Sequence, residues 1–266
     1  LDRLTTILIA PLMTCSARLP VYILLIAAFI PNTTVWGGIG LQGLVMFGLY
    51  ATGIVGALVA AGVLRLTVLR GSRQPLLMEL PSYKWPNPAN VLLGLLDRAK
   101  IFMRRIGTII LSVLVVLWFL STFPSAPAGA TEPAIYYSFA GIIGRGLEPL
   151  LAPIGFNWQI AIALVPGLAA REVAVAALGT VYALSGDKEA IAETLATTLA
   201  HDWTLATALA LLAWYVFAPQ CLATLAAARR ETNSWRWPVF MFAYLIVLAY
   251  VAALVTYRVA LAMGGG

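Results

Sequence analysis

The chain has too few charged side chains to cover the surface of a water-soluble domain. Of its 266 residues only 11% are charged and 61% are hydrophobic, and the mean hydropathy is +0.91. A soluble domain usually carries about a quarter charged residues. Much of the surface must therefore meet lipid, and the composition predicts an all-α integral membrane protein.

Side chains that often carry chemistry are also scarce. The sequence has one histidine, His201, and two cysteines, Cys15 and Cys221, which both lie in apolar stretches. Two such cysteines make no disulfide framework, so they do not reveal the redox compartment. The net charge of +6 is explained by basic cytoplasmic loops, and no nucleic-acid-binding motif competes with that explanation, so no nucleic-acid partner is expected. Because the sequence begins Leu1-Asp2-Arg3 without an initiator Met, we expect a fragment cut just before a membrane segment.

Five or six apolar stretches approach the roughly 20 residues that a membrane-spanning helix needs. They cover residues 4–30, 41–69, 106–123, 158–184, 205–228 and 239–262. Basic residues concentrate in 65–105, which predicts a cytoplasmic loop, with an amphipathic helix at 89–105 on the inner leaflet. We therefore divide the chain into residues 1–64, 65–105 and 106–266.

The first apolar stretch contains a polar interruption. Pro11 and Pro20 flank the sequence Thr-Cys-Ser-Ala-Arg, which ends at Arg18. A charge in the hydrocarbon core costs about 3 kcal/mol or more, so an intramembrane ionisable residue is a candidate for function. Interrupted helices in corresponding parts of a chain indicate the midplane site of a transporter.

A second interruption is predicted in residues 158–184, where Pro166-Gly167 precede Arg171-Glu172. The basic residues near 229–236 predict a cytoplasmic loop, which simple counting of spans would place outside. The conflict disappears if 158–184 bends at Pro166-Gly167 and returns to the side it entered. The fold expected is thus a polytopic helix bundle with interrupted, gate-type helices.

Sulfur-bearing side chains at these interruptions suggest an ion pathway. Cys15 lies beside Met13 and Ser16, and thiolate or thioether sulfur suits borderline or soft transition metals, with a carboxylate such as Glu172 completing the site. Cys221, in another apolar stretch, is a further candidate. Two alternatives stay open: the cysteines are small packing residues, and Glu172 pairs with its neighbouring arginine to brace a kink.

The two intramembrane arginines are assigned another role. Arg18 and Arg171 are expected to hold the interrupted helices in place rather than to contact a cation, together with Pro11, Pro20, Pro166 and Gly167.

Several sequence motifs, in order along nearly the whole chain, resemble the ferrous-iron transport protein B (FeoB) family. They are APLMTCSARLPVY, LLMELPSYKWPNPANVLL, RAKIFMRRIGTIIL, PGLAAREVAVAALGTVY and FAPQCLATLAAARRETNSWRWP. The resemblance implies a multi-pass Fe²⁺ permease of the bacterial inner membrane, with Fe²⁺ as the transported substrate. Cys15 then corresponds to the cysteine of the second gate, Cys221 to the later family cysteine, and Glu172 to the acid of an Ala-(Lys/Arg)-Glu-Val motif.

The resemblance also implies parts that this chain does not contain. In the family a cytoplasmic N-terminal G domain hydrolyses GTP, and a first gate lies upstream; the printed sequence has no G-x-x-x-x-G-K-[ST] loop, so the chain is not expected to be an enzyme. Expected partners are membrane lipid, that G domain, small cytoplasmic Feo proteins and a second copy of the chain. The alternatives are a nucleoside or organic-anion permease anchored on Arg18 and Arg171, and a non-transporting membrane anchor for a GTPase.

Overall fold

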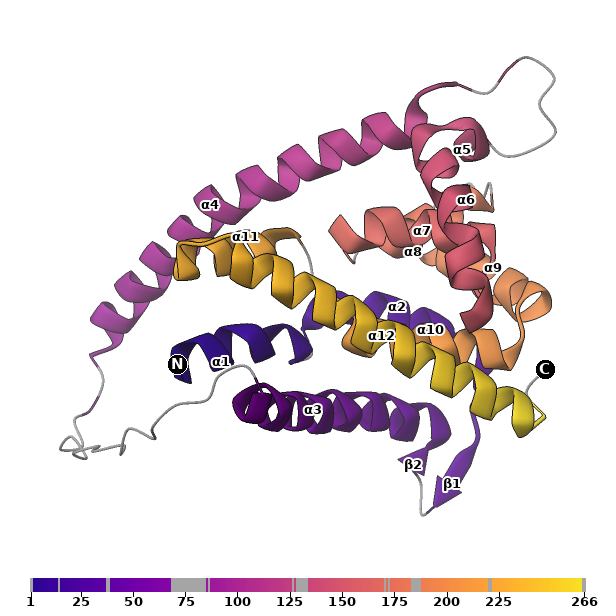
Figure 1. The fold of residues 1–266 in the computed structure, drawn as a ribbon, viewed down its shortest axis with the longest axis horizontal. Helices are drawn as coiled ribbons and strands as arrows, with labels where there is room; N and C mark the ends of the chain where they lie inside the picture. The colour runs from indigo at the N-terminus through magenta and orange to yellow at the C-terminus, as the bar shows by residue number, and fades with distance from the viewer. Residues whose placement is uncertain are drawn as a thin grey trace.

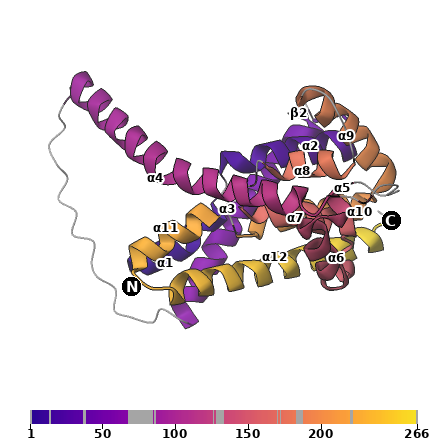
Figure 2. The ribbon, with the colours of Figure 1, turned by 90° about the horizontal axis from the view of Figure 1, so that it is seen from above.

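The computed structural model describes residues 2–13, 15–36, 39–67, 85, 87–125, 127, 134–169, 171, 173–182, 188–219 and 222–264. These residues are mostly helical, and the helices gather in a bundle from which only α4 extends (Figures 1 and 2). The prediction of a helical bundle with interrupted helices is confirmed.

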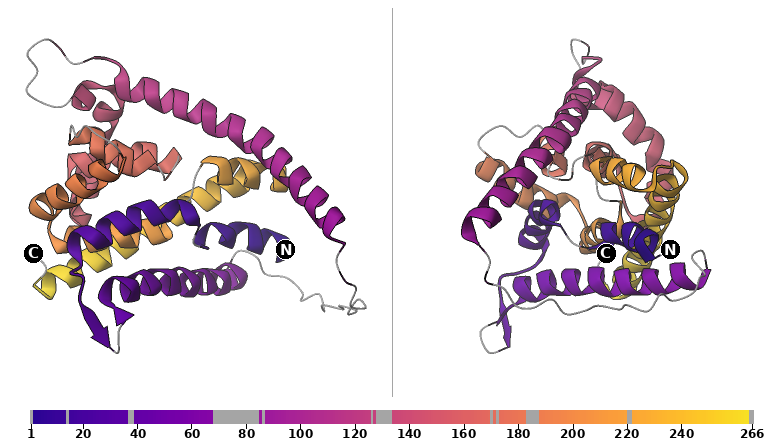
Figure 3. Two further views of the ribbon diagram at one scale, coloured as in Figure 1. Left: turned by 180° about the vertical axis from the view of Figure 1, so that it is seen from behind. Right: turned by 90° about the vertical axis from the view of Figure 1, so that its left-hand side faces the viewer.

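The first apolar stretch is an interrupted helix, seen as two successive helices in Figure 3. It consists of α1 (Asp2–Ile9), the 3-10 turns η1 (Ala10–Leu12) and η2 (Ser16–Arg18), and α2 (Leu19–Phe29). Pro11 lies inside η1, and Pro20 occupies the first turn of α2, where its missing N–H costs nothing. The interruption therefore falls between the two prolines.

Two long helices return across the bundle. A short antiparallel hairpin of β1 (Thr34–Trp36) and β2 (Ile39–Gly40) leads into α3 (Leu41–Thr67), and α12 (Arg236–Ala262) closes the chain. In the described part of the chain, three helical stretches are long and apolar enough to cross a membrane, residues 3–29, 41–67 and 236–262. A bent pair of helices makes up to four, against the five or six stretches predicted from the sequence.

One end of the bundle carries basic residues. The N-terminus, α11 (Leu222–Thr232) and the beginning of α12 lie at this end, and the C-terminus and the hairpin lie at the other (Figures 1 and 3). Arg3 of α1 forms an ion pair with Glu231 of α11 here. The cytoplasmic assignment of this basic end stays a prediction.

Helix α4 (Pro88–Thr122) runs across the boundary that the sequence analysis placed between residues 105 and 106. It is one helix of 35 residues, started by the side chain of Asn87, which accepts a hydrogen bond of 3.0 Å from the Ala89 amide. The amphipathic segment 89–105 and the apolar segment 106–123 are thus continuous, because only Gly107 lies at their junction and a single glycine does not end a helix. At 1.5 Å per residue, α4 is about 52 Å long and exceeds a hydrocarbon core of about 30 Å.

The middle of the chain forms a compact group of short helices. After α5 (Ala134–Tyr137) come α6 (Phe139–Leu151), η3 (Ala152–Ile154), α7 (Trp158–Ala169), α8 (Val173–Val181) and α9 (Lys188–Asp202). Residues 139–154 and 158–165 are bent by 116° relative to one another. α7 packs against both α6 and α8.

The predicted bend at Pro166-Gly167 is wrong in its position. α7 continues through both residues to Ala169, and the helix is interrupted between Ala169 and Val173. In a membrane helix, neighbouring helices can re-satisfy the backbone groups that a proline frees, and α7 packs against both α6 and α8. This packing holds the helix together through the proline, and the re-entry of 158–184 stays a prediction.

A further interruption separates α10 (Leu205–Phe217) from α11. α10 is the central helix of the bundle, with nine buried residues and extensive packing against α12. It ends before Ala218 and Pro219, which are both buried. The interrupted segments α1–α2, α7–α8 and α10–α11 supply the candidate site.

Candidate functional site

Two arginines are buried where helices are interrupted. Arg18, the last residue of η2, has 0% of its surface exposed, and Arg171, between α7 and α8, has 2%. Charged side chains at such depth in a membrane protein need partners inside the protein. Their hydrogen bonds show what holds them.

Arg171 binds the end of α10. Its Nη1 donates to the carbonyl of Tyr215 at 2.7 Å, and its Nη2 donates to the carbonyls of Ala218 at 2.6 Å and Pro219 at 2.9 Å. The last carbonyls of a helix have no intrahelical partner and carry the negative end of its dipole. Arg171 therefore satisfies the backbone at the α10–α11 interruption.

Arg18 has a similar but less complete role. Its Nη2 donates to the carbonyl of Pro11 at 3.0 Å, across the interruption between η1 and η2. Its Nε and Nη1, and the hydroxyl of Tyr22, are buried without a hydrogen-bond partner in the part of the chain that the structure describes. Both arginines thus donate to backbone carbonyls at interruptions, and their role in holding the interrupted helices stays a prediction.

Cys15 lies between η1 and η2 with extended backbone (φ −106°, ψ 160°). Its side chain is half-buried and forms no disulfide. Arg171 lies within electrostatic reach of Cys15, Arg18, Tyr22 and Tyr215. The fold thus brings together the first interruption and the α7–α8 interruption; that they form a transport site stays a prediction.

The other predicted pathway residues are less clearly placed. Met13 is 52% exposed and adopts extended backbone, and Ser16 is exposed at the start of η2. Glu172 and Cys221 lie outside the described residues. In the sequence Glu172 directly follows Arg171, and Cys221 follows Pro219, an acceptor of Arg171, by two positions.

Gly167 allows three helices to approach closely. A Cβ atom at this position would lie 3.2 Å from the Cβ of Ala174 on α8 and 3.2 Å from the hydroxyl of Tyr215 on α10. Both distances are shorter than most real Cβ contacts. Gly167 is therefore a close-packing position and does not mark the break.

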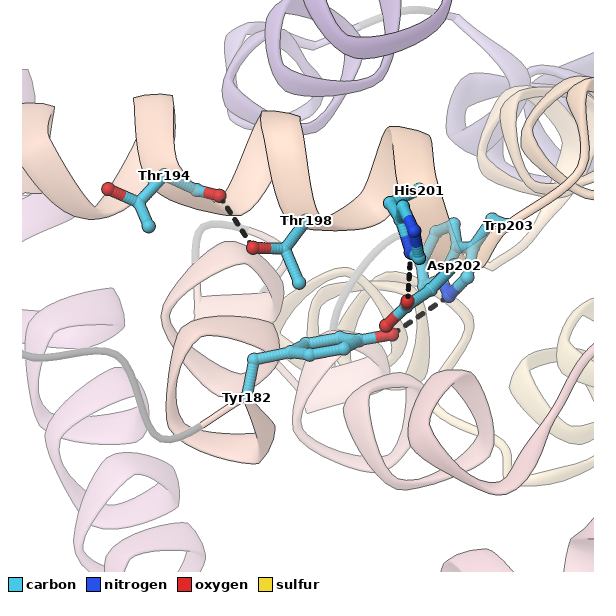
Figure 4. A network of polar contacts seen from close by, with 6 residues as sticks. All are labelled: Tyr182, Thr194, Thr198, His201, Asp202 and Trp203. Atoms are coloured by element: carbon cyan, nitrogen blue, oxygen red, sulfur yellow. Dashed lines mark hydrogen bonds and ion pairs between the residues drawn. The ribbon is translucent and has the colours of Figure 1, made fainter.

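A polar cluster where the end of α8 meets the end of α9 does not form a metal site (Figure 4). His201 lies 3.2 Å from Asp202 through its Nδ1, and the indole of Trp203 donates to the hydroxyl of Tyr182 at 2.9 Å. Across the residues that the structure describes, no group of three or more His, Cys, Asp or Glu side chains is arranged to hold a metal ion.

Sequence reasoning missed the acceptors of the two arginines. The carbonyls of Pro11, Tyr215, Ala218 and Pro219 are backbone atoms, which any residue provides. Pro11 and Pro219, which are helix breakers in apolar stretches, gave a signal that backbone groups would be left unpaired there. Tyr22 gave none, because a tyrosine in a membrane helix usually indicates an interface.

Comparison with known proteins adds two family matches. A family model named Gate and described as nucleoside recognition matches residues 103–235. A model described as the C terminus of ferrous iron transport protein B matches residues 46–98. No solved structure matches the chain.

Several curated relatives share more than 30% of their aligned residues with the chain. The Fe(2+) transporter FeoB of Leptospira interrogans is 37% identical over 273 residues, covering 97% of this chain and 39% of the relative. The FeoB of Methanocaldococcus jannaschii is 37% identical over 259 residues, covering 96% of this chain and 36% of the relative. A fusion of Fe(2+) transport protein A with FeoB from Porphyromonas gingivalis is 33% identical over 298 residues, covering 97% of this chain and 34% of the relative. The chain thus spans somewhat more than a third of the length of the relatives it matches.

Proposed function

Because this chain belongs to the Gate family and to the ferrous iron transport protein B family, we propose that it forms part of the path by which Fe²⁺ crosses the bacterial inner membrane. The observation that carries the proposal is the likeness, over 97% of the chain, to proteins named Fe(2+) transporter. The site supports it, because a half-buried thiol lies at an interrupted helix inside a membrane bundle.

Cys15 is the residue we assign to contact the ion. Its thiolate is a better ligand for Fe²⁺ than for Mg²⁺ or Ca²⁺, which prefer oxygen. Met13 and Cys15 both have extended backbone between the two 3-10 turns, and Met13 and Ser16 are near enough in sequence to add sulfur and hydroxyl donors. Fe²⁺ would exchange part of its water shell for these donors during passage.

Glu172 and Cys221 are proposed to line the same path. Each is a sequence neighbour of the bonds between Arg171 and the end of α10. A carboxylate and a second thiolate there would offset the repulsion that two guanidinium groups exert on a divalent cation. Arg18 and Arg171 are assigned to the backbone carbonyls that they bind, not to the ion.

The nucleotide hydrolysis that drives the full transporter is proposed to take place outside this chain. A cytoplasmic G domain would bind and hydrolyse GTP, and the basic residues of 65–105 would transmit its state to the membrane helices. Small cytoplasmic Feo proteins and a second copy of the chain are further proposed partners.

Uptake of radioactive Fe²⁺ under anaerobic, reducing conditions tests the proposal. The full-length protein is expressed in cells lacking other iron importers and compared with Cys15→Ser and Glu172→Gln at matched membrane levels. We expect uptake to fall by at least tenfold in Cys15→Ser, since one lost ligand interaction of about 1.4 kcal/mol changes an equilibrium tenfold. Thr198→Ala on α9 is a control, because that hydroxyl bonds only its own helix at Thr194.

The same assay distinguishes the alternatives. Normal uptake in both variants would contradict the assigned path and favour a non-transporting anchor or a path elsewhere. The description of the Gate model as nucleoside recognition makes competition by nucleosides a necessary second arm. Nucleoside uptake independent of Fe²⁺ would favour a nucleoside permease.

A further inference from the structure

An apolar groove lies between α3 and α12, which run along the bundle in opposite directions (Figure 1). Its volume is about 820 Å³, within the range of roughly 300–1,000 Å³ that small-molecule sites occupy. One wall is a stripe of α3 from Thr52 to Thr67, the other is a stripe of α12 from Phe240 to Val251, and Phe217 of α10 also lines the space. These two fully described helices both pack against α10 and have little direct contact with each other, so the groove stays open between them.

The walls of the groove offer little to a polar ligand. Three of the lining side chains carry a hydroxyl, and each hydroxyl already donates to a backbone carbonyl. Thr52 and Thr67 donate at 2.7 Å to carbonyls four residues earlier in α3, and Tyr244 donates to the carbonyl of Leu8. Every other residue that lines the groove is apolar. The walls therefore favour a hydrocarbon chain over an ion or a nucleoside.

The groove has the length of one membrane leaflet. At 1.5 Å per residue its α3 wall is about 22 Å long and its α12 wall about 17 Å, against about 15 Å for half of a hydrocarbon core. Nearer the hairpin the groove closes, because Val45 of α3 packs on the core cluster to which Ala253 of α12 belongs. A further membrane-spanning helix would need a face along the whole core, whereas one acyl chain needs only this length.

Basic residues lie at the open end of the groove. Arg236, in the first turn of α12, is exposed and precedes Phe240 by four positions, so it lies on the face of α12 that lines the groove. The first turn of a helix also favours an anion through the helix dipole. The last turn of α11 adds two more arginines at this end of the bundle, and the acid Glu231 there is paired with Arg3.

We propose that this groove binds an anionic phospholipid from the leaflet on the basic side of the bundle. One acyl chain lies between α3 and α12, and the headgroup phosphate accepts hydrogen bonds from the guanidinium group of Arg236. Basic pockets between membrane helices are typical sites for acidic headgroups. The acyl chain gains little by leaving the bilayer for the groove, because both surroundings are apolar. The headgroup therefore decides which lipid stays.

The bound lipid contacts the end of α10. Phe217, which lines the groove, is the last residue of α10 and directly precedes Ala218, whose carbonyl accepts a hydrogen bond from Arg171. The lipid thus packs behind the α10–α11 interruption. This placement rests on the groove alone and does not depend on which ion the protein carries.

Thermal unfolding of the full-length protein in detergent tests the headgroup preference without any iron. Phosphatidylglycerol is compared with phosphatidylcholine of identical acyl chains at equal mole fractions. We expect phosphatidylglycerol to raise the unfolding temperature saturably by a few degrees more than phosphatidylcholine does, as a ligand that binds only the folded state. Equal effects of the two lipids would overturn the proposal.

A pair of arginine variants locates the headgroup. Arg236→Gln removes the charged donor, so the half-saturating mole fraction of phosphatidylglycerol should rise about tenfold, as the loss of one charge-assisted hydrogen bond predicts. Arg258→Gln is the matched control, because Arg258 is exposed near the opposite end of the same helix. Without added lipid, both variants should unfold at the temperature of the wild type. The same rise in both variants would overturn the assignment to Arg236.

Photo-crosslinking in cell membranes identifies the occupant in the full-length protein. A benzophenone amino acid replaces either Val59, which lines the groove, or its neighbour Leu58, which is similarly exposed but lies outside the groove. We expect adducts at position 59 to be enriched at least several-fold in acidic phospholipid over those at position 58. Equal lipid composition at the two positions would overturn the proposal. So would adducts at position 59 to another segment of the same chain or to a second copy, since either would then fill the groove.

Discussion

Nη2 of Arg171 donates a hydrogen bond of 2.6 Å to the carbonyl of Ala218 and thereby joins the interruption after α7 to the interruption after α10. The same principle recurs at the first interruption, where Arg18 binds the carbonyl of Pro11. An interrupted helix leaves carbonyls without partners, and lipid cannot supply donors. Long side chains from other segments do so, and the breaks therefore stabilise one another.

Replacing Arg171 should separate the two interruptions. Arg171→Gln removes three charge-assisted hydrogen bonds from a buried site, and a loss of about 3 kcal/mol or more of unfolding free energy is expected. Arg171→Lys keeps the charge and part of the bonding, so its loss should be smaller. Thermal unfolding in detergent should give the highest unfolding temperature for the wild type, a lower one for Arg171→Lys and the lowest for Arg171→Gln.

The control for this series is Arg236→Gln, at the exposed start of α12. A surface arginine contributes at most about 1 kcal/mol, so this variant should resemble wild type. Equal stability of Arg171→Gln and Arg236→Gln would contradict the role assigned to Arg171.

Sequence reasoning predicted the places where helices are interrupted better than the way the breaks are held. Pro11 and Pro20 predicted the first break because each restricts the backbone locally. Pro166 predicted a break in the wrong place, because α7 continues through it and the packing of α6 and α8 against α7 is not visible in the local sequence. Similarly, nothing in the sequence around Arg171 identifies Ala218, 47 residues later, as its acceptor.

Close packing of α6 on α7 depends on one glycine. A Cβ atom at Gly144 would lie 2.8 Å from both the Cα and the backbone nitrogen of Ile162, and backbone cannot move aside as a flexible side chain can. Gly144→Ala should therefore cost about 1–3 kcal/mol through forced separation of the helices. Thermal unfolding again provides the measurement.

Gly146, two residues away on the same helix, is the matched control. A Cβ atom there would meet nothing within 4 Å. Because alanine favours helix over glycine, Gly146→Ala should be neutral or stabilising by up to about 1 kcal/mol. A similar loss in both variants would mean that the effect arises from the helix itself and not from contact with Ile162.

Tyr244 provides a third side chain that satisfies an interrupted helix. Its hydroxyl, on α12, donates to the carbonyl of Leu8 near the end of α1. Tyr244→Phe keeps the ring and should cost about 1 kcal/mol, the usual net value of one such bond. The expected readout is a lower unfolding temperature together with faster cleavage of α1 by protease. Unchanged cleavage with a lowered unfolding temperature would show that the bond does not restrain α1.

Cys15 should be protected from alkylation by the ion that the path carries. The side chain is half-buried at a polar interruption, so a small maleimide should react with it more slowly than with a fully exposed thiol. In full-length protein whose other cysteines are replaced by serine, Fe²⁺ under anaerobic conditions should slow the reaction at least several-fold. Mg²⁺ at the same concentration should have little effect, because it prefers oxygen ligands and sheds its water reluctantly.

The comparison of the two cations separates ligation from screening. Any divalent cation slightly changes the local potential near Arg18 and Arg171, and that change would be equal for Fe²⁺ and Mg²⁺. A thiolate bond is specific to Fe²⁺ and should disappear when a chelator removes the metal. Equal protection by both cations would contradict a bond to Cys15 and would return this cysteine to the role of a small packing residue.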